Sequence, residues 1–129
     1  NKRFRIPARY TRYKKQQVIE HPDTFGDMIE AEVSGYVSFR FDGKSYKLVA
    51  SEMEDGSLFI KFRDLTSGKE TYPPSRYCHT EPVKSGRVAL DLNYAYSPPC
   101  AFTEYATCTF APTENTLPFR VEAGEMHSR

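Results

Sequence analysis

Thiol and carboxylate side chains are the groups of this chain that could act as nucleophiles or as acids and bases. Three cysteines occur, Cys78, Cys100 and Cys108, and an odd number rules out a complete disulfide framework. A nucleophilic Cys100 needs a neighbouring base, and none of the three histidines stands at a spacing that indicates such a pair. The two candidates for a catalytic group are Cys100, as a thiol, and Asp91, as a carboxylate.

The same cysteines leave two structural alternatives open. Cys100 and Cys108 could pair across a hairpin, but without a secretory signal we expect reduced thiols. Zinc sites typically use spacings such as Cys-x2-Cys, and the seven residues between Cys100 and Cys108 do not supply that spacing. We therefore predict no metal site, and cysteines that behave as small apolar side chains.

Arginine and tyrosine side chains give the chain the chemistry of a binding site. Guanidinium groups hold anions through paired hydrogen bonds, and Tyr lines amphipathic pockets. Two loops, 72–77 and 96–100, each place Tyr beside a stiff Pro-Pro unit that restrains the backbone. We predict a pocket for a small anionic or aromatic ligand, lined by Arg63, Tyr72, Arg76, Tyr77, Asn93 and Tyr96.

These residues also have structural interpretations that stay open. Arg63 and Arg76 could form ordinary ion pairs with Asp64 or Glu70, and the tyrosines could form the rim of a core. No phosphate-binding glycine loop, nucleophile elbow or H-E-x-x-H motif occurs, so the sequence implies no particular cofactor.

The elements that must position these residues are predicted to be strands. Residues 36–41 and 44–50 alternate between apolar and polar side chains, and Asp42-Gly43 between them is a strong hairpin signal. Residues 57–63 continue the pattern, with Leu58, Ile60 and Phe62 facing the core and Phe59, Lys61 and Arg63 facing away. These segments predict an antiparallel meander.

Further strands are predicted outside the meander. They are residues 87–92, residues 117–122 as a last strand, residues 16–20, and an edge strand in which Phe4 and Ile6 alternate with polar residues. Residues 22–28 should form a loop or a single helical turn. No stretch has a sustained helical apolar period, so we predict an all-β, mainly antiparallel domain over residues 1–129, a small barrel or sandwich with little helix.

Charge is divided unevenly along the chain. Residues 1–20 carry seven basic side chains and one acidic one, whereas the other 109 residues carry 11 basic and 16 acidic ones. This division favours pairing of the basic strand within the protein or with a second copy, and argues against nucleic acid as the partner. No unbroken apolar run of about 18 residues occurs, so no membrane association is expected. The first residues lack the apolar stretch of a signal peptide, which predicts a cytoplasmic protein.

Ordered motifs in the C-terminal half resemble one family of bacterial and archaeal proteins. They occupy residues 62–72, 75–77, 90–102, 105–108, 114–118 and 123–125. The chain is similar here to the domain of unknown function family numbered 1684, closely over residues 36–126 and loosely upstream. Members of that family look longer, so the chain is expected to be the C-terminal part of a larger protein or a shorter member. Cys78 departs from the family pattern, and the resemblance implies no established activity.

Three functions are consistent with the sequence. The first is a β domain that binds a small ligand through the predicted pocket. The second is an enzyme of undefined reaction that uses Cys100 or Asp91. The third is an interaction module, including a homodimer, that pairs through its basic N-terminal strand.

Overall fold

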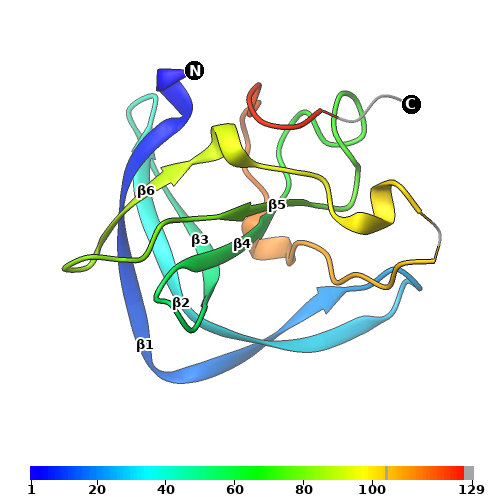
Figure 1. The fold of residues 1–129 in the computed structure, drawn as a ribbon, viewed down its shortest axis with the longest axis horizontal. Helices are drawn as coiled ribbons and strands as arrows, with labels where there is room; N and C mark the ends of the chain where they lie inside the picture. The colour runs from blue at the N-terminus through cyan, green and yellow to red at the C-terminus, as the bar shows by residue number, and fades with distance from the viewer. Residues whose placement is uncertain (104, 127–129) are drawn as a thin grey trace.

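The computed structural model is an all-β protein, as predicted, and it describes residues 1–103 and 105–126 (Figure 1). The strands are β1 (Arg5–Pro22), β2 (Met28–Phe41), β3 (Lys44–Glu52), β4 (Leu58–Phe62), β5 (Arg76–His79) and β6 (Arg87–Asp91). The helices of the described chain are short 3-10 turns, η1 (Lys2–Phe4), η2 (Leu92–Tyr94), η3 (Pro99–Ala101) and η4 (Thr113–Asn115). No helix in this part of the chain is long and apolar enough to span a membrane.

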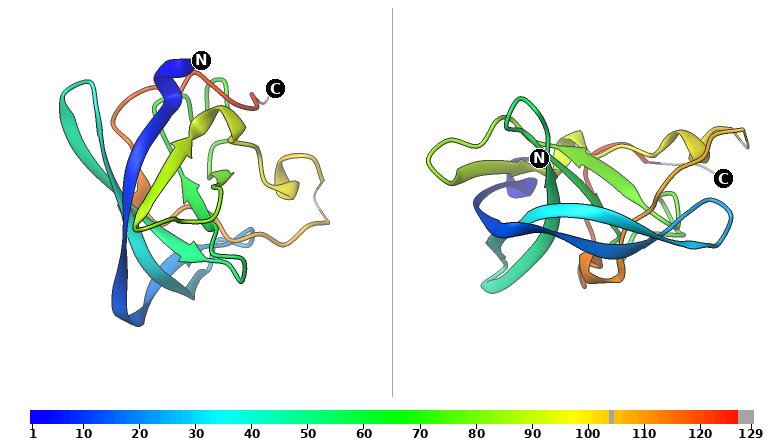
Figure 2. Two further views of the ribbon diagram at one scale, coloured as in Figure 1. Left: turned by 60° about the vertical axis from the view of Figure 1, so that its left-hand side comes forward. Right: turned by 90° about the horizontal axis from the view of Figure 1, so that it is seen from below.

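The six strands form one antiparallel sheet in the order β5-β4-β3-β2-β1-β6. The sheet curls into a half-barrel, which the two views of Figure 2 show from the side and from below. The predicted meander is present as β2, β3 and β4. Its first turn uses Asp42 and Gly43, both with positive φ, which is the backbone conformation that a tight two-residue hairpin turn requires.

The core lies on the concave face of the curled sheet. Alternate residues of the strands point inward there and are almost completely buried, among them Ile6, Val37, Leu48 and Ile60. The C-terminal segment crosses the open side of the half-barrel and contributes Leu117, Val121 and Ala123 to the same core. Each strand therefore buries one face, which explains the alternating pattern of the sequence.

Two predicted strands differ from the structure. Residues 117–122 form no regular strand, because their backbone is held by side chains as well as by one bridge at Thr116. Val121 N donates to the Asp64 carboxylate at 2.6 Å, and the Val121 carbonyl accepts from Arg76 at 2.9 Å. The N-terminal strand is also not an edge strand, since β1 lies between β2 and β6.

Several basic residues at the start of the chain pair with acidic residues elsewhere. Arg12 makes a bidentate ion pair with Glu52 at 2.8–3.0 Å, and Arg3 pairs with Asp42. Arg5 lies 3.7 Å from the carboxylate of Asp91. These contacts join β1 and η1 to other parts of the sheet, which is the kind of internal pairing that the charge division favours.

Candidate functional site

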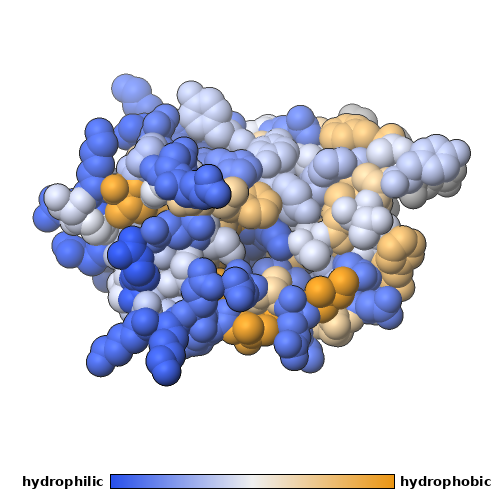
Figure 3. All heavy atoms as spheres, turned by 60° about the horizontal axis from the view of Figure 1, so that its bottom comes forward, coloured by the Kyte–Doolittle hydropathy of each residue, from blue (hydrophilic) through white to orange (hydrophobic). Residues whose placement is uncertain are grey.

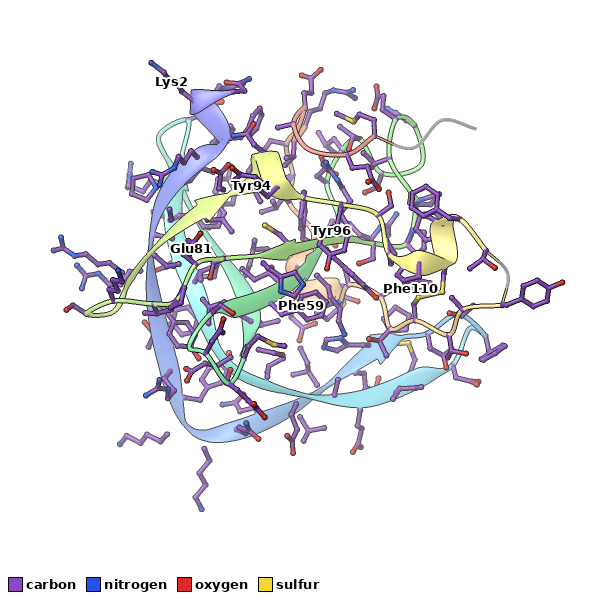
Figure 4. All side chains as sticks on the ribbon, in the orientation of Figure 1. Lys2, Phe59, Glu81, Tyr94, Tyr96 and Phe110 are labelled. Carbon is purple, nitrogen blue, oxygen red and sulfur yellow. A yellow bond between two sulfur atoms is a disulfide. The ribbon has the colours of Figure 1, made fainter. Side chains whose placement is uncertain are left out.

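The predicted site residues lie in three separate environments and do not line one common pocket. Arg63, Tyr72 and Tyr77 lie near a groove at the tip of the β1–β2 hairpin, whereas Asp91, Asn93 and Tyr96 lie around a cleft between β5 and β6. Arg76 lies in the protein interior. In Figure 4, Phe110 marks the groove, and Tyr94 and Tyr96 mark the neighbourhood of the cleft.

Arg76 has no exposed surface, so its side chain is not accessible to a ligand. Its guanidinium donates to the carbonyl oxygens of Val121 and Ala123 and lies 3.7 Å from the equally buried carboxylate of Asp64. The guanidinium also stacks over the ring of Phe62, 5.4 Å from its centroid. Arg76 therefore holds the C-terminal segment in place. An ion pair with Asp64 is one of the structural alternatives that the sequence left open for this arginine.

The groove, which we call the Arg63 groove, has a volume of about 390 Å³. Three segments form it: the hairpin tip at 22–26, Arg63 with Pro74, and residues 110–116. The tip is shaped by Asp23, whose carboxylate accepts hydrogen bonds from the backbone N–H groups of Phe25 and Asp27 at 2.9 Å. This Asx turn, with Gly26 at φ 82°, is a common conformation for a tight reversal of the chain. It engages Oδ1 of Asp23, which is the acidic side chain among the described lining residues.

Arg63 is the one cationic side chain that lines the groove among the residues that the structure describes. Its Nε donates to the carbonyl of Pro73 at 2.8 Å, which fixes the direction of the guanidinium. Its two terminal nitrogens have no hydrogen-bond or ion-pair partner among residues 1–103 and 105–126. A guanidinium oriented in this way presents a planar fork of donors, the geometry that binds a carboxylate or phosphate.

Aromatic side chains lie in and beside the groove. Phe110 lines the groove and packs edge-on against Tyr72, with 6.1 Å between the ring centroids. Tyr77 donates its hydroxyl hydrogen to the carbonyl of Thr109 at 2.5 Å, next to Phe110 in the chain. Burial raises the pKa of Tyr77 to about 12, so this hydroxyl remains a donor at neutral pH.

Cys100 and Cys108 form a disulfide, which corrects the expectation of reduced thiols. Their Cα atoms are 6.3 Å apart, within the usual range for such a bond. The bridged loop reaches the groove through Thr24, whose hydroxyl accepts from the N–H of Cys108 at 2.8 Å. A disulfide sulfur is not a free thiolate, so Cys100 in this state is not a nucleophile. Cys78 remains free, and burial raises its pKa to about 12.

A pair of nitrogen bases, the buried His21 and the half-buried Lys61, lies close to the groove residues in the sequence and was not predicted as a site. Lys61 Nζ is 3.2 Å from Nδ1 of His21 and 2.5 Å from the hydroxyl of Thr109. Burial lowers the pKa of Lys61 to about 8. Burial, with the nearby charge of Lys61, lowers the pKa of His21 to about 4. The alternation of β4 already placed Lys61 on one face with Arg63, but nothing in the sequence linked either residue to His21.

Asp91, the other catalytic candidate, caps the turn η2. Its carboxylate accepts from the backbone N–H of Asn93 at 3.1 Å and from the side-chain amide of Asn93 at 2.9 Å. The adjoining cleft has a volume of about 400 Å³ and is lined by Arg5, His79, Tyr94 and other residues. Both Asp91 and Asn93 are thus engaged in local structure, which is a common use of Asp and Asn after a strand.

Tyr96, which follows η2, packs with aromatic side chains of β4 and β5. The Tyr96 hydroxyl is 2.7 Å from Nε2 of His79, and the His79 ring stacks on Phe59 with 4.6 Å between centroids. Tyr77 packs edge-on against both Phe59 and Tyr96.

In the described part of the chain, no three His, Cys, Asp or Glu side chains are grouped so that they could hold a metal ion.

Comparisons with known proteins place the chain in a family but give it no activity. The family model of a protein of unknown function, DUF1684, matches residues 1–126. A similar solved structure is the solution NMR structure of an uncharacterized protein from Haloarcula marismortui, with 32% sequence identity and a TM-score of 0.78. The similarity covers 98% of this chain and 72% of the archaeal one. No curated protein matches. The chain belongs to the DUF1684 family.

Proposed function

We propose that this protein binds a small ligand that carries an anionic group and an aromatic ring, and that it does so in the Arg63 groove. The observation that carries the proposal is the oriented Arg63 guanidinium, whose terminal nitrogens have no partner within the described residues although the groove opens beside them. A volume of about 390 Å³ is within the range of small-molecule sites. Binding sites of this kind combine an apolar wall with a few fixed polar groups.

Each part of the groove would contact a different part of the ligand. Arg63 would bind a carboxylate or phosphate oxygen pair, and Thr24, Thr113 and Thr116 line the same space. Phe110, which is held by its edge-on contact with Tyr72 and is 6% exposed, would supply the apolar wall against which an aromatic group packs. The hairpin tip and the disulfide loop are joined by several hydrogen bonds, so the groove is preformed.

The test is an NMR titration of the ¹⁵N-labelled protein with benzoate and, separately, with inorganic phosphate. Benzoate should perturb amides of the groove, such as those of Thr24, Ala111 and Thr116, more strongly than phosphate does. The substitution Arg63→Gln should weaken benzoate binding about tenfold, the loss expected for one charge-assisted interaction at a partly exposed site.

Lys69→Gln is the matched control, because it removes the same charge from an exposed loop outside the groove. Equal weakening by the two substitutions, or perturbations spread over the whole surface, would contradict the proposal. Native mass spectrometry of the purified protein provides an independent check for a ligand that stays bound during purification.

A further inference from the structure

A basic surface separate from the Arg63 groove lies on the outer face of the sheet, far along β1 from the hairpin tip. The register pairs Arg9 on β1 with Arg87 on β6 on one side and with Ser38 on β2 on the other. Directly opposed residues of antiparallel strands project from the same face, so the two guanidinium groups share one face. Arg40, two residues after Ser38 on β2, lies on this face as well. We call this set, Arg9, Arg40 and Arg87, the arginine face.

Nothing within the described residues neutralises Arg9 or Arg87. Arg3, Arg5 and Arg12 each have an acidic partner, yet no ion pair involves Arg9 or Arg87. Like charges that are directly opposed across two strands are destabilising. The sheet therefore holds two directly opposed like charges without an acidic side chain paired to either within the described residues, an arrangement that a bound anion would stabilise.

The arginine face is hollowed, and Pro7 explains why. Proline has no N–H for the ladder, and the paired register of β1 with β2 begins only at Arg9. β1 and β2 therefore separate at Pro7 and leave a shallow groove of about 590 Å³. Small side chains such as Ala8, Ser38 and Ser45 are among its lining residues, together with all three arginines. Figure 3 shows that hydrophilic side chains dominate the left half of the molecule, where this end of the sheet lies.

We propose that this groove binds a compact multivalent oxyanion, such as the diphosphate or triphosphate group of a phosphorylated small molecule. Three guanidinium groups around one hollow match several phosphate oxygens at once. Arg40 is already oriented by its hydrogen bonds to the carbonyl of Gly43 at 2.7 Å and to the Ser45 hydroxyl at 3.4 Å. Nucleic acid fits this groove less well, because the aromatic side chain among its lining residues, Phe39, is almost completely buried. The half-buried rings of Tyr13 and Tyr36 lie further along the sheet, outside the groove, and pack against each other with 6.0 Å between their centroids.

The experiment measures tripolyphosphate binding by isothermal titration calorimetry at about 20 mM and about 150 mM salt, concentrations that change the screening of exposed charges. The test variant is the double substitution Arg9→Gln, Arg87→Gln. The matched control is Lys14→Gln, Lys15→Gln, which removes the same charge from exposed positions on β1 outside the groove. The arginine variant should lose about tenfold or more in affinity, and the lysine variant less than about threefold.

Folding of the variants is followed by thermal unfolding without ligand. Because Arg9 and Arg87 repel each other, the arginine variant should melt at the same temperature as the wild type or higher, and it should lose the stabilisation that tripolyphosphate gives the wild type. Equal affinity losses in the two double variants, or no binding by the wild type at low salt, would overturn the proposal.

An oligonucleotide and a second variant separate this site from the alternatives. If a short oligothymidylate binds more tightly than tripolyphosphate and with the same dependence on Arg9 and Arg87, the surface is a nucleic-acid site and the small-molecule proposal is wrong. Arg63→Gln distinguishes the two sites: tripolyphosphate binding that this substitution removes belongs to the Arg63 groove, whereas binding that the double arginine substitution removes belongs to the arginine face. The two binding proposals therefore fail independently of each other.

Discussion

Acid should destabilise this protein through His21 in particular, and the size of the effect follows from the structure. The His21 side chain is 4% exposed, its Nε2 has no hydrogen-bond partner within the described residues, and its Nδ1 lies near the Lys61 ammonium. Burial and that neighbouring charge disfavour the imidazolium and lower the pKa from 6.5 to about 4. The substitution His21→Phe replaces the ring by one of similar shape that cannot be protonated.

The sign of the pH dependence follows from proton linkage. As the pH falls below 6.5, the unfolded chain takes up a proton at His21, whereas the folded protein does not until about pH 4. Acid therefore favours the unfolded chain across this window. Because one pKa unit corresponds to about 1.4 kcal/mol, the full effect is about 3 kcal/mol, of which about 2.5 kcal/mol falls between about pH 7.5 and about pH 4.5.

Urea unfolding of the wild type and of His21→Phe at these two pH values measures the effect. The loss in free energy of unfolding should be about 2.5 kcal/mol larger for the wild type. Any constant cost of fitting phenylalanine cancels, because only the change with pH is compared. His79→Phe is the control, since it makes the same substitution at an exposed histidine outside the His21–Lys61 pair. If the wild type and His21→Phe lose stability in parallel, the interpretation of His21 as a buried neutral base is refuted.

Two further predictions concern the contacts that hold the long loops. Asp64→Asn should lower the free energy of unfolding by about 3 to 5 kcal/mol in urea denaturation, because it leaves the buried Arg76 guanidinium without its counter-charge; a loss below about 1 kcal/mol would contradict that role. Replacing Cys100 and Cys108 by serine should cost about 2 kcal/mol, as expected for closing a short loop, and a reductant should lower wild-type stability to the level of the variant without affecting the variant itself.

The meander could be predicted from the sequence because its signals are local. Alternation fixes which face of each strand is buried, and Asp42-Gly43 supplies the positive φ values of the first turn. The same reasoning failed for residues 117–122, where alternation is present but the partners include the side chains of Asp64 and Arg76. An alternating pattern shows that one face of a segment is buried. It does not show which groups form hydrogen bonds with the backbone of that segment.

The residues of the proposed groove were predictable by type more than by place. Arg63, Tyr72 and Tyr77 lie at or beside one groove, as a Tyr and Arg site requires, whereas Asn93 and Tyr96 belong to the other side of β5. The two groups of residues could not be assigned to different places because they lie far apart along the chain. Sequence spacing shows which side chains a strand presents, but the closing of the curled sheet decides which strands share a pocket.

By itself, the sequence determined that the chain is all-β, which faces of β2, β3 and β4 are buried, and where the first hairpin turns. The tertiary structure alone decided the pairings between distant segments: β6 with β1, the disulfide loop with the hairpin tip, and Arg76 with the C-terminal segment. The physical reason is the distance along the chain over which each interaction acts. Backbone conformation and alternation are set by neighbouring residues, whereas burial of a charge, opposition of Arg9 to Arg87 and lowering of the His21 pKa depend on segments that meet only when the sheet curls around its core.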